Sequence, residues 1–203
     1  MHSENEWLDA TLGACPVMAI LRGFGPERTL QLAEKAWDLG VTLVEVPIQS
    51  TRDIEALEAT VAAGKGRGLA VGAGTVIDDK TVEQARDAGA QFTVSPGFSA
   101  DVVRASVAAG MPSIPGVATA SEIQAAVGIG LRWLKAFPAA RLTPAWFKDM
   151  AGPFPQVRFV ATGGIDAGNA AGFLAAGASV VALGSALADP EQLSAITPLL
   201  TRA

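Results

Sequence analysis

Short apolar or β-branched runs alternate with amphipathic helical stretches eight times along this chain of 203 residues, at intervals of roughly 20 to 26 residues, the size of one βα unit. The predicted strands are residues 17–21, 42–46, 69–73, 91–95, 112–115, 131–135, 157–160 and 179–183. Helices are predicted at residues 26–39, 51–63, 78–88, 99–109 and 167–176, and these are followed by Gly40, Gly64, Gly89, Gly110 and Gly177 as helix ends.

Eight such units without a linker or a break in composition predict a closed parallel (β/α)8 barrel, the TIM barrel of the α/β class. An open doubly wound sheet is the alternative. We expect a single domain over residues 1–203, with residues 1–15 as an N-terminal helix or arm.

The composition of the chain limits the classes of partner and the cellular compartment that we expect. A net charge of −5 argues against nucleic acids and anionic membranes. No apolar run approaches the roughly 20 residues of a membrane span, and the acidic start lacks the features of a secretory signal. The single cysteine, Cys15, excludes an internal disulfide and fits a reducing compartment. We therefore expect a cytoplasmic protein.

The chain has no tyrosine, and its one histidine, His2, lies in a terminus expected to be disordered. Histidine bases and histidine-bound metals are thereby excluded from the expected chemistry. Acid and base steps must then be carried out by carboxylates, lysine or water.

One lysine and one carboxylate stand out among the charged residues of the predicted strands. Lys135 is the only lysine in the eight strands, and Glu45 is their only acidic residue. Burial favours the neutral amine, which is the form that attacks a carbonyl carbon to make a Schiff base. Since barrel active sites lie where the strands end, we predict that both residues are catalytic. A structural ion pair is the alternative interpretation.

Glycine-rich loops follow the last two predicted strands, where many barrels bind phosphate through backbone N–H groups. They contain Gly163 and Gly164 after the seventh strand, and Gly184 and Ser185 after the eighth. Tight turns are the alternative explanation. Arg22, after the first strand, offers a cationic fork for a carboxylate or phosphate, or else makes a surface salt bridge.

The chain resembles the class I aldolases that cleave 2-keto-3-deoxy-6-phosphogluconate or its galactonate epimer, from about Val17 to Ala188. The matching segments are residues 19–23 (AILRG), 44–47 (VEVP), 72–76 (GAGTV), 94–97 (VSPG), 114–119 (IPGVAT), 134–138 (LKAFP), 162–165 (TGGI) and 184–185 (GS). The resemblance implies a barrel, no metal or other cofactor, a homotrimer, and a small phosphorylated keto acid as substrate.

The resemblance also implies roles for single residues. Lys135 would form the Schiff base and Glu45 would carry protons. The substrate site would contain Arg22, Thr75, Pro96, Phe137 and Thr162, with phosphate held by Gly163, Gly164, Gly184 and Ser185. Gln49 looks more like the galactonate type and Thr162 more like the gluconate type, so the epimer preference stays open.

Two rival functions remain at this point. One is a phosphosugar isomerase, epimerase or lyase that uses only the phosphate loops, with Lys135 as an electrostatic partner. The other is a barrel that binds a phosphorylated metabolite without catalysis. The Gly72-Ala73-Gly74 triplet follows a predicted strand but lacks the later glycine of a dinucleotide fingerprint, so nucleotide binding is not expected.

Overall fold

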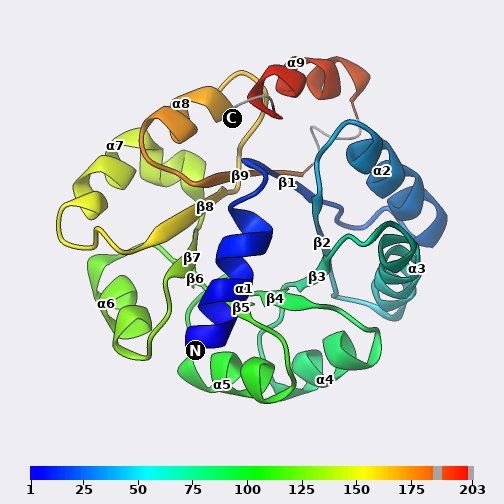
Figure 1. The fold of residues 1–203 in the computed structure, drawn as a ribbon, viewed down its shortest axis with the longest axis horizontal. Coiled ribbons are helices and arrows are strands. Elements are labelled where there is room, and N and C mark those ends of the chain that lie inside the picture. Colours follow the sequence, from blue (N-terminus) through cyan, green and yellow to red (C-terminus); the bar gives the residue numbers. More distant parts are fainter. Residues whose placement is uncertain (185–188, 201–203) are drawn as a thin grey trace.

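The computed structural model describes residues 1–184 and 189–200, which form a ring of parallel strands surrounded by helices (Figure 1). The strands are β1 (Val17–Ile20), β2 (Leu43–Pro47), β3 (Val71–Gly74), β4 (Phe92–Val94), β5 (Ser113–Ile114), β6 (Gly116–Val117), β7 (Trp133–Ala136), β8 (Arg158–Thr162) and β9 (Val180–Leu183). The helices are α1 (His2–Leu12), α2 (Pro26–Asp38), α3 (Thr51–Arg67), α4 (Asp79–Asp87), α5 (Ala100–Ala108), α6 (Ala120–Gly128), α7 (Ala139–Ala151), α8 (Ala170–Ala175) and α9 (Pro190–Leu200).

The predicted (β/α)8 barrel is confirmed, with one difference in its fifth strand. The predicted strand at residues 112–115 is divided into β5 and β6, which flank Pro115. Proline has no N–H to donate to a ladder, which accounts for the interruption. β5 pairs with β4, and β6 pairs with β7, so the strand order β5-β4-β3-β2-β1-β9-β8-β7-β6 closes through Pro115. The backbone N–H of Lys135 donates to the Pro115 carbonyl at 2.9 Å.

One predicted helix end was wrong. Gly64 was expected to end its helix, but α3 continues to Arg67 and Gly68 caps it in the left-handed region, at φ 70°. Gly64 instead allows close packing, because a Cβ there would lie 3.0 Å from a Val71 methyl on β3. The other four predicted glycines each lie one residue beyond their helix cap, as expected.

Alternate residues of each strand face the barrel interior and the helices. On β8, Phe159 faces outward and meets Trp146 and Phe147 of α7, with ring centroids 5.1 and 5.8 Å away. Phe147 also contacts Phe173 of α8 at 5.6 Å. These edge-to-face aromatic contacts pack α7 and α8 against the sheet and leave the interior face of β8 to Val160 and Thr162.

Helix α1 lies across the barrel at the end where the strands begin (Figure 1). The expectation of a disordered terminus at His2 was wrong, because α1 begins there and buries Asn5, Leu8 and Leu12. With its amino end covered, the barrel interior is accessible to a ligand from the carboxyl ends of the strands. None of the helices in the described part of the chain is both long and apolar enough to cross a membrane.

Candidate active site

The structure brings Lys135 and Glu45 together inside the barrel. Lys135 Nζ lies 4.0 Å from Glu45 Oε1, and the two residues are 3% and 1% exposed. Among the described residues, neither carboxylate oxygen of Glu45 has a hydrogen-bond partner. Burying a charged group without hydrogen bonds is costly, so the pair is poorly arranged for stability alone.

A pocket of about 420 Å³ opens above Lys135 at the carboxyl ends of the strands. Seven residues predicted for the site line it, namely Arg22, Lys135, Phe137, Thr162, Gly163, Gly164 and Gly184. The ammonium of Lys135 lies 5.2 Å from the centroid of the Phe137 ring, so the aromatic wall and the amine face the same space. This pocket has the size and composition of a site for a small polar ligand.

A second hollow of about 750 Å³ adjoins this pocket at Phe24. Exposed side chains at the starts of α2 and α3 line it, and none of its polar side chains is buried. Chemistry that requires exclusion of water is therefore placed in the smaller pocket.

The loop after β8 has the form expected of an anion-binding turn. Gly163 and Gly164 both have positive φ, of 95° and 73°. A Cβ on Gly163 would lie 3.1 Å from the Phe137 ring, and one on Gly164 would lie 2.6 Å from the Ala140 Cβ. Within residues 1–184 and 189–200, no acceptor is found for the N–H group of either glycine. Both N–H groups are thus available to a ligand oxyanion. The predicted Ser185 lies outside the described residues.

Thr162 ends β8 on the interior side and is only 4% exposed. Its hydroxyl has no hydrogen-bond partner among the described residues, and it lines the pocket beside Lys135. A buried hydroxyl without a partner is rare in folded proteins, so this group is suited to bind a polar atom of a ligand.

Arg22 lies at the exposed rim of the pocket, and its guanidinium donates to the Gln49 side-chain oxygen at 3.4 Å. Arg22, predicted to bind an anionic group, is therefore in contact with Gln49, the residue that looks more like the galactonate type. No acidic side chain of the described chain forms an ion pair with Arg22, so the predicted alternative of a surface salt bridge is not found there.

Two predicted substrate residues do not line the Lys135 pocket. Thr75 follows β3 with φ at 62°, a left-handed conformation that is uncommon outside glycine. Pro96 is exposed and lines a separate hollow of about 260 Å³. The Pro96 carbonyl nevertheless approaches β6, since a Cβ on Gly116 would lie 2.1 Å from it, and Gly116 pairs with Lys135. Their roles in binding stay predictions.

Sequence reasoning missed the part played by Gly74. A Cβ at this position would lie 2.0 Å from Glu45 Oε1, so only glycine leaves room for the carboxylate. Gly72, on the same face, leaves room for Phe92 in the same way. The signal was present, because glycines two residues apart in a strand mark close approach by another group. Phe24, Ile20 and Ala182 also line the pocket and were not predicted.

A carboxylate with several hydrogen bonds lies near the rim of the same barrel end. Glu122, in the first turn of α6, accepts hydrogen bonds from the backbone N–H groups of Ala118 and Thr119 at 2.8 and 2.9 Å. These bonds, the one from Ala118 above all, hold the pKa of Glu122 below its ordinary value of 4.5. The resulting capping box fixes the chain as it leaves β6.

No cluster of three or more histidine, cysteine, aspartate or glutamate side chains occurs in the part of the chain that the structure describes. The polar groups that line the pocket are an amine, a hydroxyl, a guanidinium and backbone N–H groups, and the buried Glu45 carboxylate lies 4.0 Å from the amine. Such a set can form an imine, carry a proton and hold an oxyanion.

Comparison with known proteins gives a consistent result. The family of KDPG and KHG aldolases matches residues 8–197. The chain is 34% identical to the 2-dehydro-3-deoxy-6-phosphogalactonate aldolase of Escherichia coli, over 85% of this chain and 84% of that protein. It is 38% identical to the 2-dehydro-3-deoxy-phosphogluconate aldolase of Zymomonas mobilis, over 78% of this chain and 75% of that protein.

Among solved structures, the chain is similar to the KDPG aldolase of Legionella pneumophila, which was captured with pyruvate as a covalent carbinolamine intermediate. The TM-score is 0.81 with 33% sequence identity, and the match covers 94% of this chain and 95% of that one.

Proposed function

The chain belongs to the KDPG and KHG aldolase family, and from this premise we propose that Lys135 is the residue that forms its Schiff base. It is a class I aldolase, a lyase that breaks a carbon–carbon bond in a 2-keto-3-deoxy-6-phospho sugar acid to give pyruvate and glyceraldehyde 3-phosphate. The observation that carries the assignment of Lys135 is its buried amine at the base of the pocket, 4.0 Å from Glu45.

The reaction begins when the neutral amine of Lys135 adds to the C2 ketone of the substrate to give a carbinolamine. Loss of water then leaves an iminium, which withdraws electrons from the neighbouring carbons. Glu45 is the one carboxylate among the described residues that forms an ion pair with Lys135, which supports the proposal that it accepts and returns protons in these steps.

Cleavage follows when Glu45, directly or through one water, removes the proton of the C4 hydroxyl. The C3–C4 bond breaks, its electrons pass into the iminium to give an enamine, and glyceraldehyde 3-phosphate leaves. The enamine is protonated at C3, and hydrolysis of the resulting iminium releases pyruvate and restores the Lys135 amine.

The two anionic ends of the substrate require separate partners. The N–H groups of Gly163 and Gly164 are suited to the phosphate, since no described residue accepts from them, and Gly184 lines the same side of the pocket. Arg22 and Gln49 at the rim are suited to the polar groups near the carboxylate. The Thr162 hydroxyl is left to hydrogen-bond a substrate oxygen.

Trapping with borohydride in the presence of pyruvate tests the proposal. We expect a mass increase on the peptide that contains Lys135, because reduction converts the imine into a stable secondary amine. An unmodified Lys135, or an adduct only on the exposed Lys148 of α7, would contradict the assignment.

The epimer preference is tested by pyruvate release from the gluconate and galactonate substrates side by side. Relatives named for each epimer match the chain at similar identity, so identity does not decide between them. Thr162→Val removes a hydroxyl and keeps the shape of the side chain. If the hydroxyl binds the C4 oxygen, this change will alter the ratio of the two rates, whereas equal losses on both substrates would exclude that role.

We also propose that the protein is a cytoplasmic homotrimer. Ile77, 56% exposed, stands beside an apolar hollow lined by Val76, Pro96, Phe98 and Val102, and an apolar patch of this kind is suited to a second copy of the chain. Light scattering coupled to gel filtration should give three times the chain mass of 20.7 kDa for the native protein and a smaller mass for Ile77→Asp. A monomeric native protein would contradict the proposal.

A further inference from the structure

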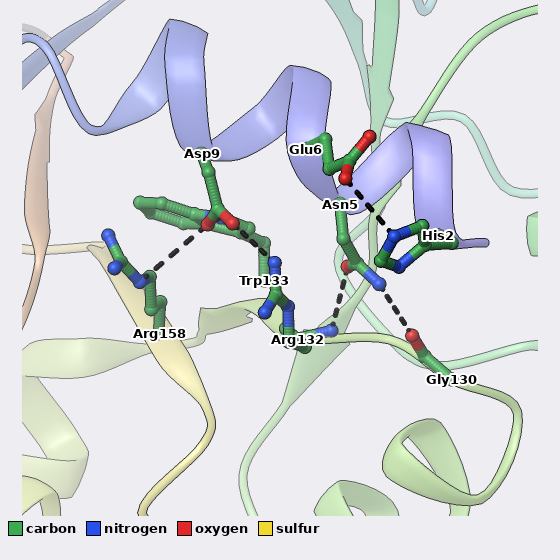
Figure 2. Close-up of polar contacts among 8 residues, drawn as sticks. All are labelled: His2, Asn5, Glu6, Asp9, Gly130, Arg132, Trp133 and Arg158. Carbon is green, nitrogen blue, oxygen red and sulfur yellow. Dashed lines mark hydrogen bonds and ion pairs between the residues drawn. The ribbon is translucent and has the colours of Figure 1, made fainter.

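A polar network ties α1 to the strand that carries Lys135, at the end of the barrel opposite the active-site pocket. The Asp9 carboxylate accepts a hydrogen bond from the indole N–H of Trp133 at 2.9 Å and forms an ion pair with the Arg132 guanidinium. The Arg158 guanidinium lies 3.7 Å from the same carboxylate (Figure 2). Three side chains thus surround one carboxylate. They come from the residue just before β7, from the first residue of β7 and from the first residue of β8.

A second residue on the same face of α1 contacts the same segment. Asn5, four residues before Asp9 and 7% exposed, donates to the Gly130 carbonyl at 2.8 Å and accepts from the Arg132 backbone N–H at 3.1 Å. In contrast, Glu6 of the same helix pairs with the exposed His2 (Figure 2). The polar contacts of α1 are therefore made mainly with residues 130–133, where the chain enters β7.

Trp133 connects this network to the active site. It is fully buried and lies two residues before Lys135 on β7, so both side chains face the barrel interior. Two residues of strand span roughly 6.6 Å, which places the indole directly below the lysine position. The Arg158 guanidinium also lies 5.6 Å from the centroid of the Trp133 ring, so the indole is held at its edge and at its face.

We infer that Asp9 is a positioning residue for Lys135, which acts by fixing Trp133 and with it the inward face of β7. This inference rests on the proposed role of Lys135. Without the carboxylate, the buried indole N–H would lack an acceptor, and two neighbouring guanidinium groups would lose their common counter-charge. The indole and the strand would shift to relieve both effects, and Lys135 would move with them.

The test is the initial rate at which borohydride traps pyruvate on Lys135 in the full-length protein, measured with the thermal midpoint of unfolding. We expect Asp9→Ala to slow imine formation roughly 10-fold, because small misplacements of a reacting group have large effects on rate. Asp9→Asn keeps an oxygen that accepts from the indole N–H and loses the charge. It should restore the trapping rate to within about threefold of the native rate while the midpoint stays lowered.

Two control variants separate positioning from stability. Glu6→Ala removes the same charge from the same helix and should leave the trapping rate unchanged. Val82→Ala removes buried methyl groups of α4 and should lower the midpoint without slowing imine formation. A native trapping rate in Asp9→Ala, or an equal loss of rate in Val82→Ala, would overturn the inference.

A double-mutant cycle tests the route through the indole. Trp133→Phe keeps a ring below the lysine and removes the N–H, so adding Asp9→Ala should change the trapping rate by less than about twofold. If Asp9→Ala lowers the trapping rate as much in the Trp133→Phe background as in the native protein, Asp9 acts by another route and the inference is overturned. The comparison of Asp9→Ala with Asp9→Asn is decisive even if Trp133→Phe does not fold. If the native protein forms no imine, the proposed function itself fails, whereas a native imine with unaffected Asp9 variants refutes only the positioning role.

Discussion

At the amino end of the barrel, the Asp9 carboxylate has partners on Arg132, Trp133 and Arg158, whereas at the carboxyl end neither oxygen of Glu45 has a hydrogen-bond partner in the described chain. The hydroxyl of Thr162, also at the carboxyl end, likewise has no hydrogen-bond partner among the described residues. Satisfied polar groups stabilise a fold, and a buried polar group without a partner at a pocket can be satisfied by a ligand. The comparison therefore contrasts a carboxylate that holds α1 against the barrel with one that we propose takes part in the reaction.

The largest expected effect concerns the amine itself. Lys135→Ala should abolish borohydride trapping and reduce pyruvate release by on the order of 10⁴-fold or more, as loss of a covalent nucleophile does. The folded structure should persist in circular dichroism, because the contact of the lysine with Glu45 is a loose one of 4.0 Å. Appreciable turnover by this variant would mean that the reaction does not proceed through an imine on Lys135.

Glu45→Gln is expected to have the next largest effect. The amide preserves the shape of the side chain and cannot carry the proton, so steady-state turnover should fall by about 10²- to 10⁴-fold. Imine formation with pyruvate should remain detectable, because Lys135 is intact. A variant with native turnover would show that Glu45 is a structural partner of the lysine after all.

Gly74→Ala tests whether the space around Glu45 matters. Its Cβ would lie 2.0 Å from Glu45 Oε1, so the carboxylate must move, and turnover should fall by roughly 10²-fold. The matched control is Gly66→Ala, at an exposed position of α3 where a Cβ meets no atom within 4 Å. That change should leave activity intact and stabilise the helix by about 0.5–1 kcal/mol. Equal activities in the two variants would contradict the prediction.

The smallest effect is expected for Glu122, a paired carboxylate at the reactive end of the barrel. Glu122→Gln should leave turnover unchanged and lower the free energy of unfolding by about 0.5–1 kcal/mol, the value of a helix cap. Because hydrogen bonds lower the pKa of Glu122 in the folded state, its contribution is fully present above the ordinary value of 4.5. This contribution to stability is lost as the pH falls through the lowered pKa of Glu122 in the folded state.

Urea unfolding of the native protein and of Glu122→Gln at pH 7 and pH 3 measures this contribution. The difference between the two stabilities should be smaller at pH 3 than at pH 7, because part of the contribution is lost once the pH falls below the ordinary pKa of 4.5. A gap that stays constant with pH, or a loss of turnover at pH 7, would refute the distinction between paired and unpaired carboxylates.

The βα repeat and the position of Lys135 and Glu45 were predictable because they depend on local patterns. An apolar run predicts a strand, and a charged residue within it stands out whatever the rest of the chain does. The break at Pro115 was less evident, because proline is tolerated at strand ends. The two segments are revealed only by their partners, since the segment before Pro115 pairs with β4 and the segment after it pairs with β7.

Contacts between distant residues could not be predicted. Asp9 and Trp133 are 124 positions apart, and nothing in the sequence near either one indicates the other. The close approach of the Glu45 carboxylate to Gly74 likewise depends on two strands lying side by side in one register. Sequence patterns identify what a residue can do, whereas these contacts depend on the closed ring.

The interruption at Pro115 has a consequence for how the enzyme fluctuates. The bond from the Lys135 amide to the Pro115 carbonyl helps to join the two sides of the ring, so this amide hydrogen is protected from solvent only while the ring is closed. Hydrogen exchange at this one amide would therefore report the frequency of ring opening. An opening that breaks this bond also displaces the lysine, so the lifetime of the closed ring limits the lifetime of the reactive geometry.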